Sequence, residues 1–411
     1  MADTMSYKQK YWIVFVCMFI QAIPFGIAQN IQPLFIPYVV DKFNFSLASF
    51  SLIFTFGAVA SAVFSPFLGK LFGKINIKVI FLTGTIVSSL SFLAFGLART
   101  LPEFYIYSAL SQIGCVFFSG LGVPYVINNW FPNKGRGKAL GIAFSGGSIG
   151  NIFLQQITSY LLSQKGPSAT YIIFGIVSLV VSIPTVLLFI RMPKDGEITH
   201  DVDQSQEQSN VVETGPTAAQ VRKDKYFWMF TIGYAIIAIS ISALSTQYAT
   251  FFTNQLKLDP IIIGIIGSVF AASCLLGNVG GGILFDRLGT FKTMFIAMIL
   301  EAVSIIAMLL ATNNVVFAFV FAICYGLNVY SYMAAPGFMT SDIFGKREAS
   351  VKLGIVSLIF AIGFAIGSTL FGFLVDTFNF SLAWIAMLAC VIGGYGLLLT
   401  AIKRFKHESL S

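Results

Sequence analysis

The sequence predicts an all-α integral membrane protein with twelve transmembrane helices, arranged as two pseudosymmetric six-helix bundles. Only 10% of the 411 residues are charged and 56% are hydrophobic, with a mean hydropathy of +0.84, whereas a soluble domain carries about 25% charged residues. The chain contains about twelve apolar runs near the roughly 20 residues that cross a bilayer. A glycine-bounded turn recurs 213 residues apart, at Gly69 and Gly282. This recurrence predicts a repeated unit.

The apolar runs define the predicted helices and the domain boundaries. They lie near residues 11–39, 46–68, 78–98, 104–128, 138–162, 168–190, 226–254, 260–285, 292–312, 314–340, 352–375 and 380–402. The first run is too long for the apolar region of a signal peptide, so we expect an uncleaved helix. The polar stretch that contains Asp201–Asn210 is typical of a flexible linker. We therefore expect an N-terminal six-helix bundle at 1–190, a cytoplasmic linker at 191–225, and a C-terminal six-helix bundle with a short cytoplasmic tail at 226–411.

The basic residues predict the orientation of the chain. Of the 25 Lys and Arg, all but Lys42, Arg99, Lys165 and Lys257 fall at the N-terminus, in the tail or after even-numbered predicted helices. Basic residues are retained on the cytoplasmic face. We therefore expect a multi-pass protein of the cell membrane with both termini cytoplasmic. The net charge of +8 is then a topology signal, which argues against nucleic acid as a partner.

The repeated turn is best defined in its second copy, which reads Gly282-x-x-x-Asp286-Arg287-x-Gly289. The corresponding positions of the first copy are Gly69, Gly73, Lys74 and Asn76. Outside the turns, Gly150 corresponds to Gly363 at the same offset. In transporters built from repeats, the solute site lies near the membrane midplane between the halves.

The second turn resembles the loop signature of the major facilitator superfamily between its eighth and ninth helices. The first turn resembles the partner signature between the second and third helices, with Gly73 in place of the acid. Three further stretches are similar to the oxalate/monocarboxylate porters of that superfamily. They are Trp130–Lys134 with Gly141, Gly146 and Gly150, then Ser331–Gly345 with Tyr332, Pro336 and Asp342, and Phe227–Trp228. The resemblance implies a secondary transporter that works by alternating access.

The resemblance also implies charged residues in the solute cavity, and this chain lacks them. The positions concerned are Asn30, Cys274, Asn278 and Phe360. A dianion such as oxalate needs a fixed counter-charge in a medium of low dielectric constant. We therefore expect a neutral solute, a carboxylate bound by amides and helix N-termini, or a protonated acid.

Polar side chains on the helices that line the cavity in this family are the substrate-binding candidates. They are Gln29, Gln32, Gln112, Tyr125, Gln247, Tyr248, Asn278, Tyr325, Asn328 and Tyr332. The alternative role of such residues is hydrogen bonding between helices, and we favour it for Asn151, Gln155 and Gln156.

Glu301 is the one acid that lies deep in an apolar run. An ionisable group within the membrane is a functional candidate, so proton coupling and structural hydrogen bonding both stay open for it. Its sequence neighbours offer no partner, so any partner lies on another helix.

The two turns form the predicted gating motif. Its residues are Gly282, Asp286, Arg287, Gly289, Gly69 and Lys74. We expect the carboxylate of Asp286 to meet a helix N-terminus and Arg287 to bridge the bundles, so that the turn latches the cytoplasmic side.

These features predict a secondary active transporter, symporter or antiporter, for a small organic solute that is monocarboxylate-like or neutral. The alternative is proton-coupled efflux of hydrophobic or cationic compounds. An enzyme would need a cluster of His, Asp, Glu or Cys at one depth, and no Gly-x4-Gly-Lys-[Ser/Thr] nucleotide loop occurs. The five cysteines lack metal or disulfide spacing. We expect no catalytic residue, metal or cofactor, a small-molecule solute and the lipid bilayer as partners, and a monomer.

Overall fold

The computed structural model describes residues 2–131, 135–193, 215–345 and 347–408. The described residues are mostly helical. Among them, one isolated β-bridge pairs Phe72 with Ile75. Two predicted features lie outside the described residues. They are the Pro132–Lys134 part of the porter-like motif and the polar stretch Asp201–Asn210.

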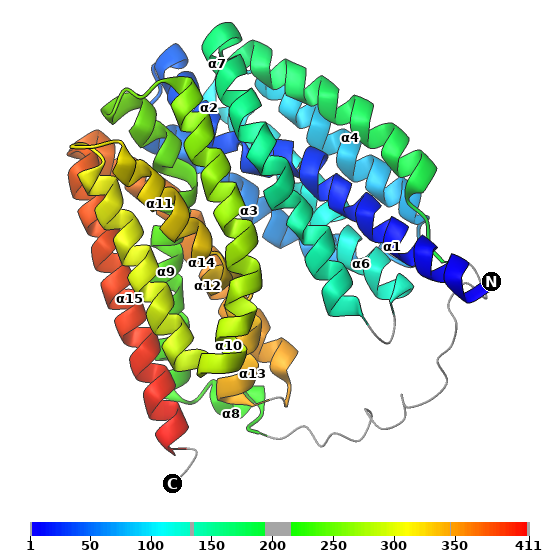
Figure 1. Ribbon diagram of the computed structural model, residues 1–411, viewed down its shortest axis with the longest axis vertical. Coiled ribbons are helices and arrows are strands. Elements are labelled where there is room, and N and C mark those ends of the chain that lie inside the picture. The colour runs from blue at the N-terminus through cyan, green and yellow to red at the C-terminus, as the bar shows by residue number, and fades with distance from the viewer. Residues whose placement is uncertain (1, 132–134, 194–214, 346, 409–411) are drawn as a thin grey trace. The chain divides into compact units, whose positions relative to one another are not determined.

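The chain divides into two compact units, of which the first comprises Met1–Asn44 and Leu52–Val211. The helices of this half of the sequence run from blue to green in Figure 1. They are α1 (Ala2–Ile20), η1 (Gln21–Asn30), α2 (Gln32–Phe43), α3 (Leu47–Gly69), α4 (Ile77–Phe95), α5 (Leu101–Cys115), η2 (Val116–Gly120), α6 (Gly122–Trp130) and α7 (Arg136–Phe189). The symbol η marks π-helical segments, which have a wider turn than an α-helix.

The second unit comprises Phe45–Ser51 and Val212–Ser411. Its helices run from green to red in Figure 1. They are α8 (Ala218–Val221), α9 (Lys225–Thr250), η4 (Phe251–Gln255), α10 (Pro260–Leu310), α11 (Val316–Leu327), α12 (Tyr330–Met333), α13 (Ala335–Phe344), α14 (Ala349–Thr377) and α15 (Phe380–Glu408).

Ten continuous helical spans of the described chain are long and apolar enough to cross a membrane. Two of them, α7 with 54 residues and α10 with 51, would each extend for about 75–80 Å if straight, well beyond the roughly 30 Å hydrocarbon core. Each reverses at one glycine. Gly166 has φ 73° and ψ 176°, and Gly289 has φ 72° and ψ 172°, a region that only glycine readily adopts. The ten spans therefore make twelve crossings, as predicted.

The predicted tenth helix, 314–340, is broken in the structure. It consists of α11, α12 and α13, separated at Asn328 and Ala334. Pro336 at the start of α13 has no N–H to donate, which accounts for the second break. The predicted first helix, 11–39, likewise contains the π-helical segment η1 around Pro24. Hydropathy could not predict these interruptions because the average over each run stays high enough for a continuous membrane-spanning helix.

One close helix contact occurs in both halves at the predicted offset. A Cβ atom added to Gly150 would overlap the carbonyl oxygen of Ala22, and one added to Gly363 would overlap the carbonyl oxygen of Ala235. Both members of the second pair lie 213 residues after those of the first. The glycines therefore let backbones touch, and the repeat extends from sequence to packing.

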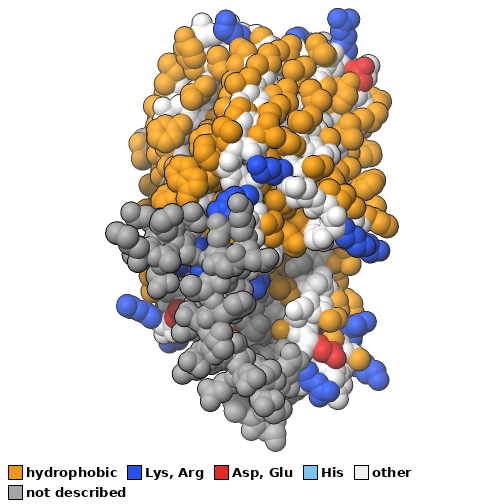
Figure 2. Space-filling model, turned by 90° about the vertical axis from the view of Figure 1, so that its right-hand side faces the viewer, with side chains coloured by type: hydrophobic (Ala, Val, Ile, Leu, Met, Phe, Trp, Pro, Cys, Tyr) orange, Lys and Arg blue, Asp and Glu red, His pale blue; other side chains and the backbone are white. Residues whose placement is uncertain are grey.

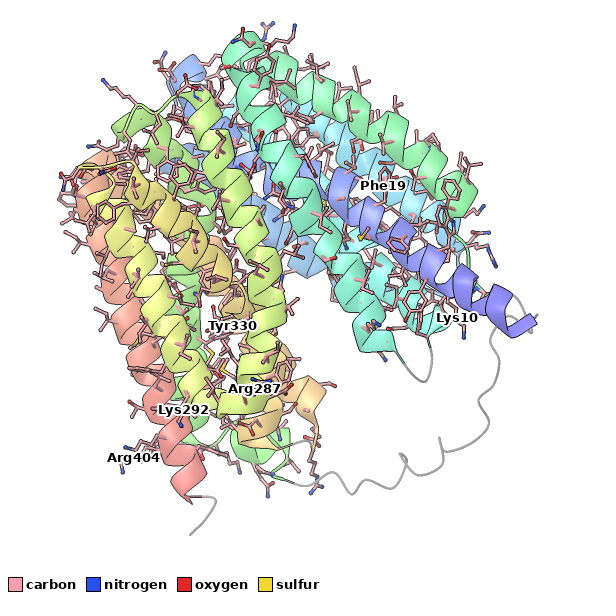
Figure 3. All side chains as sticks on the ribbon, viewed as in Figure 1. Lys10, Phe19, Arg287, Lys292, Tyr330 and Arg404 are labelled. Atoms are coloured by element: carbon pink, nitrogen blue, oxygen red, sulfur yellow. The ribbon has the colours of Figure 1, made fainter. Side chains whose placement is uncertain are left out.

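Many large apolar side chains lie on the surface of each unit. Phe153, Leu188, Leu276 and Val279 are each more than 60% exposed, and hydrophobic side chains cover much of the described surface in Figure 2. Such surfaces suit contact with lipid. Figure 3 shows Arg287, Lys292 and Arg404 near one end of the second unit. All five cysteines are free, and Cys17, Cys115 and Cys274 are buried.

Two details differ from the sequence prediction. Part of the predicted linker is folded, because α8 lies within 191–225 and the N–H of Ala218 donates to the Glu348 carboxylate at 2.7 Å. Lys352, which we assigned to a loop, lies in the first turn of α14 and is 0% exposed.

Candidate functional site

The first unit brings the amide side chains of Gln29 and Gln112 into contact, and Asn30 follows Gln29 at the end of the same helical segment. We call Gln29, Asn30 and Gln112 the amide cluster. Gln112 Nε2 donates a short hydrogen bond to Gln29 Oε1, and Asn30 Nδ2 donates to the carbonyl oxygen of Gly147 at 3.2 Å. All three are half-buried. In the described part of the chain, Gln29 Nε2 and Gln112 Oε1 have no further hydrogen-bond partner. The N–H groups of Gln29 and the side-chain carbonyl oxygen of Gln112 are therefore available to a solute.

Local geometry brings the amide cluster together. Gln29 and Asn30 end the π-helical segment η1, which contains Pro24. Proline removes a backbone donor from the helix ladder, and π-helical turns occur frequently at functional sites. On α3, Gly57 leaves the space that Gln112 fills, since an added Cβ would lie 2.7 Å from Gln112 Cγ.

The neighbouring amides have structural partners. Gln155 Nε2 donates to the Asn30 carbonyl oxygen at 3.2 Å and to Asn151 Oδ1 at 3.1 Å. The prediction of inter-helix hydrogen bonding is therefore confirmed for Gln155. Gln32, a substrate-binding candidate, is 5% exposed and accepts a long hydrogen bond of 3.4 Å from the Tyr171 hydroxyl.

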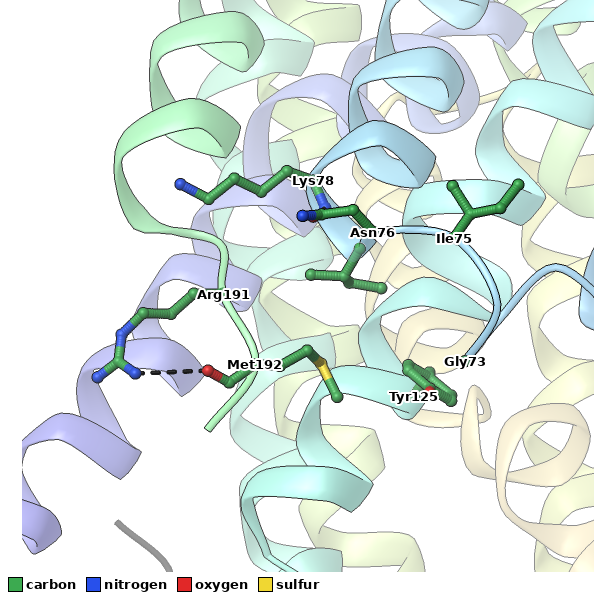
Figure 4. A pocket seen from close by; sticks show the side chains of 8 residues that line it. Gly73, Ile75, Asn76, Lys78, Tyr125, Arg191 and Met192 are labelled. Carbon is green, nitrogen blue, oxygen red and sulfur yellow. Dashed lines mark hydrogen bonds between the residues drawn. The ribbon is translucent and has the colours of Figure 1, made fainter. Parts of the chain in front are cut away.

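Tyr125 lies apart from the amide cluster, at a pocket of about 350 Å³ beside the first turn. Figure 4 shows Lys78 and Arg191 on one side of this pocket and Gly73 and Tyr125 on the other. Lys78 Nζ donates to the Leu187 carbonyl oxygen at 2.6 Å. The lysine therefore holds the end of α7, and Tyr125 belongs to this end of the unit.

In the second unit, four substrate-binding candidates are buried. Gln247 Nε2 donates to Ser368 Oγ at 2.9 Å. Tyr248 is 2% exposed and packs against Phe270 and Phe321. The Tyr325 hydroxyl donates to the Ile241 carbonyl oxygen at 2.8 Å, and Asn328 is 0% exposed.

The other two candidates of this unit are more accessible. Tyr332 is half-buried, with its ring 6.3 Å from that of Tyr325, and Asn278 is exposed on α10. Tyr332 and Asn278 are therefore more accessible to a solute than the four buried residues are.

Glu301 is the centre of a buried polar group, which we call the Glu301 cluster: Ser240, Glu301, Asn328 and Tyr395. Ser240 Oγ donates to Glu301 Oε1 at 2.5 Å, while Asn328 Nδ2 and the Tyr395 hydroxyl donate to Oε2 at 3.2 and 3.0 Å. Glu301 is 0% exposed. The prediction that its partners lie on other helices is confirmed, because they come from α9, α11 and α15. The sequence offered no signal for Ser240 and Tyr395, which lie 61 and 94 residues away.

The second gating turn is exposed and tied to its own unit. Asp286 and Arg287 are exposed, and Gly289 supplies the reversal of the helix. The adjacent Thr290 hydroxyl donates a short hydrogen bond to the Asp342 carboxylate on α13. This bond attaches the turn to the broken helix, a link that sequence analysis missed.

The first turn is built differently. Gly73 has a φ of +82°, which disfavours an acidic side chain there. The side chain of Asn76 accepts a hydrogen bond from the backbone N–H of Lys78 at 2.9 Å and so caps α4. Gly69 and Lys74 are exposed. The backbone conformation of Gly73 and the helix cap made by Asn76 thus explain why these residues stand where the second turn has Asp286 and Gly289.

Two repeated helical units with polar groups held within their spans define a multi-span solute transporter. The chain belongs to the Major Facilitator Superfamily, whose sequence profile matches residues 14–254 and 230–410. It is a transporter and not an enzyme.

Known proteins of several kinds resemble the chain. Monocarboxylate transporter 13 of Rattus norvegicus is 23% identical over 97% of this chain and 91% of its own length. The chromaffin granule amine transporter of Rattus norvegicus is 21% identical over 80% of this chain and 61% of its own length. The crystal structure of a bacterial homolog of the human lysosomal transporter Spinster, inward-facing and unoccupied, superposes with a TM-score of 0.74 at 18% identity, covering 97% of this chain and 98% of that one.

Proposed function

We propose that the protein is a secondary active transporter that moves a small organic solute, monocarboxylate-like or neutral, across the cell membrane by alternating access. The observation that carries this proposal is the amide cluster of Gln29, Asn30 and Gln112, which offers free hydrogen-bonding groups and no fixed charge. Asn278 and Tyr332 are the accessible candidates of the second unit. We propose a monomer with both termini cytoplasmic.

The charge distribution supports this class of solute. The described Lys and Arg side chains lie near the ends of the spans or beside the two glycine reversals. Amides can bind a neutral polar solute or a single carboxylate, whereas a dianion in a low-dielectric site needs cationic partners. The name of monocarboxylate transporter 13 agrees with the monocarboxylate option.

Replacing Gln112 by Leu tests this proposal. We expect uptake into proteoliposomes to fall about tenfold or more, because a site built to hydrogen-bond its solute loses much affinity when a partner is removed. The assay compares monocarboxylates, dicarboxylates, neutral polar metabolites and lipophilic cations. Asn313→Leu is the control, since Asn313 is an exposed amide in the turn after α10, and its uptake should equal the wild type. Undiminished uptake by Gln112→Leu would contradict the proposed site.

We further propose that the Gly282–Gly289 turn latches the cytoplasmic side through Asp286 and Arg287. We expect Asp286→Asn to lower the transport rate several-fold, because the amide loses the charge that a helix N-terminus favours. The rate is measured as initial uptake at saturating solute. Asp41→Asn, which changes an exposed acid at the end of α2, is the control. Equal rates for the two variants would argue against a latch.

The second candidate function is proton-coupled efflux of hydrophobic or cationic compounds. A buried acid, Glu301, and the likeness to an amine transporter support it. The two functions differ in the panel assay. Uptake of lipophilic cations without uptake of carboxylates or neutral solutes would favour efflux.

A further inference from the structure

The Glu301 cluster holds a carboxyl group without a cationic partner inside a membrane-spanning helix. Glu301 lies in the segment of α10 that follows the reversal at Gly289, twelve residues after it and nine before the end of the helix at Leu310. Its side chain is fully buried. It therefore lies near the middle of one crossing, where an uncompensated charge costs several kcal/mol.

The titratable groups that face Glu301 carry no positive charge. They are Tyr234 from α9, Tyr325 from α11, Tyr332 from α12, and Cys390 and Tyr395 from α15. Phenol and thiol groups are neutral at physiological pH. Among the described residues, Lys, Arg and His form no ion pair with Glu301, so a proton is the available means of neutralising it.

Ser240 allows the cluster to hold Glu301 either protonated or ionised. A hydroxyl has one hydrogen to donate and two lone pairs to accept. Ser240 Oγ lies 2.5 Å from Glu301 Oε1 and 2.8 Å from the Ile237 carbonyl oxygen. When Glu301 is ionised, Ser240 donates to it. When Glu301 is protonated, Glu301 can donate to Ser240, and Ser240 can donate to Ile237.

A proton suits this geometry better than a metal ion. The carboxylate oxygens already lie within 2.5 to 3.2 Å of their hydrogen-bond partners, so these partners enclose no cation-sized space. Hard divalent cations also require six or more oxygen ligands. A proton needs one acceptor and a neighbouring partner, and Ser240 supplies the partner.

Asn328 connects this carboxyl group to the broken helix. It ends α11 at the first break, its Nδ2 donates to Glu301, and its Oδ1 is buried without a hydrogen-bond partner. Next to it, the carbonyl oxygen of Ser331 accepts a hydrogen bond from the Tyr234 hydroxyl at 2.6 Å. Discontinuous helices form the solute and ion sites of many transporters. A change of charge at Glu301 thus acts directly on a side chain at the break.

We propose that Glu301 carries the coupling proton of the transport cycle, and that Asn328 transmits its protonation state to the break between α11 and α12. This proposal rests on the proposed transport function. The proton enters from the water on one side and leaves to the other, while Ser240 reverses its hydrogen bond. The broken helix then favours a different conformation in each protonation state.

The test separates coupling from transport. Proteoliposomes with wild-type protein or Glu301→Gln are assayed for accumulation driven by a pH gradient and for solute exchange at equal pH on both sides. We expect accumulation by Glu301→Gln to fall at least tenfold, to the equilibrium level, with exchange within about twofold of the wild type. Asp41→Asn should leave both unchanged. Unaltered accumulation, or equal loss of both activities, would overturn the proposal. If the wild type neither accumulates nor exchanges any solute of the panel, the proposed function itself fails.

A second measurement does not depend on transport. Infrared difference spectra between acidic and alkaline pH should contain the C=O band of a buried carboxylic acid in the wild type. The band should be absent in Glu301→Gln and present in Asp41→Asn. A spectrum of the wild type without a band that depends on Glu301 would also overturn the proposal.

Discussion

Replacing Gly150 by Val should destabilise the first unit more than any other substitution considered for it. The added side chain would enter the space of the Ala22 carbonyl oxygen, and a backbone cannot move aside as a flexible side chain can. Overpacking costs about 3 kcal/mol or more where the backbone must shift. This corresponds to a drop of roughly 6–12 °C in Tm for a domain of about 200 residues.

The measurement is the thermal unfolding of detergent-solubilised protein, followed by the loss of the monodisperse peak. Gly141→Val is the control, since Gly141 is exposed on α7 and an added Cβ meets no atom within 4 Å. Because the contact is repeated, Gly363→Val should cost about as much. A Tm for Gly150→Val equal to that of the control would mean that α7 and η1 are not in backbone contact.

Lys352→Met should strongly destabilise the second unit where α13 ends. Lys352 Nζ donates to the carbonyl oxygens of Phe344 and Gly345 at 2.5 and 3.3 Å, where α13 ends. The ammonium group thereby satisfies buried carbonyls and the negative end of the helix dipole. Methionine keeps the volume and removes both bonds, each of which contributes about 1.5–3 kcal/mol when the donor is charged.

The expected result is a drop of roughly 6–24 °C in Tm, with faster proteolysis near residue 345. Arg347→Met is the matched control, because Arg347 is an exposed cation in the same loop, and its Tm should match the wild type. If Lys352→Met has the same Tm as the wild type, Lys352 does not stabilise the end of α13.

The crossings were predictable from the sequence because each needs only length and apolar composition. The reversals at Gly166 and Gly289 fall where the apolar runs were predicted to end. The π-helical segment η1 and the break at Asn328 were not predictable. At both places regular helical hydrogen bonds between backbone groups are lost, and the sequence does not show which contacts with neighbouring helices compensate for them. Lys352 was placed in a loop because a count of charges gives the side of the membrane and says nothing about burial.

The candidate site was predictable in part. Gln29 and Gln112 could be predicted as polar residues on separate helices, and the structure brings them into contact. Gln247 and Tyr248 were predicted by the same rule, and these are buried among other side chains. Residue type and helix number do not say which face of a helix a side chain occupies. The partners of Glu301 were unpredictable for the same reason, because three helices distant in sequence supply them.

The repeated backbone contact shows which kind of position the two halves of the chain keep alike. At Gly150 and Gly363 any side chain would collide with a carbonyl oxygen. Packing within each unit therefore disfavours substitution of its glycine. At Gly73 and Asp286 the two copies differ, since each turn meets different neighbours. Steric necessity has kept the duplicated positions alike. At other close contacts the two halves differ as well, since Gly146, which packs against the Met18 carbonyl oxygen, corresponds to Ile359 at the same offset.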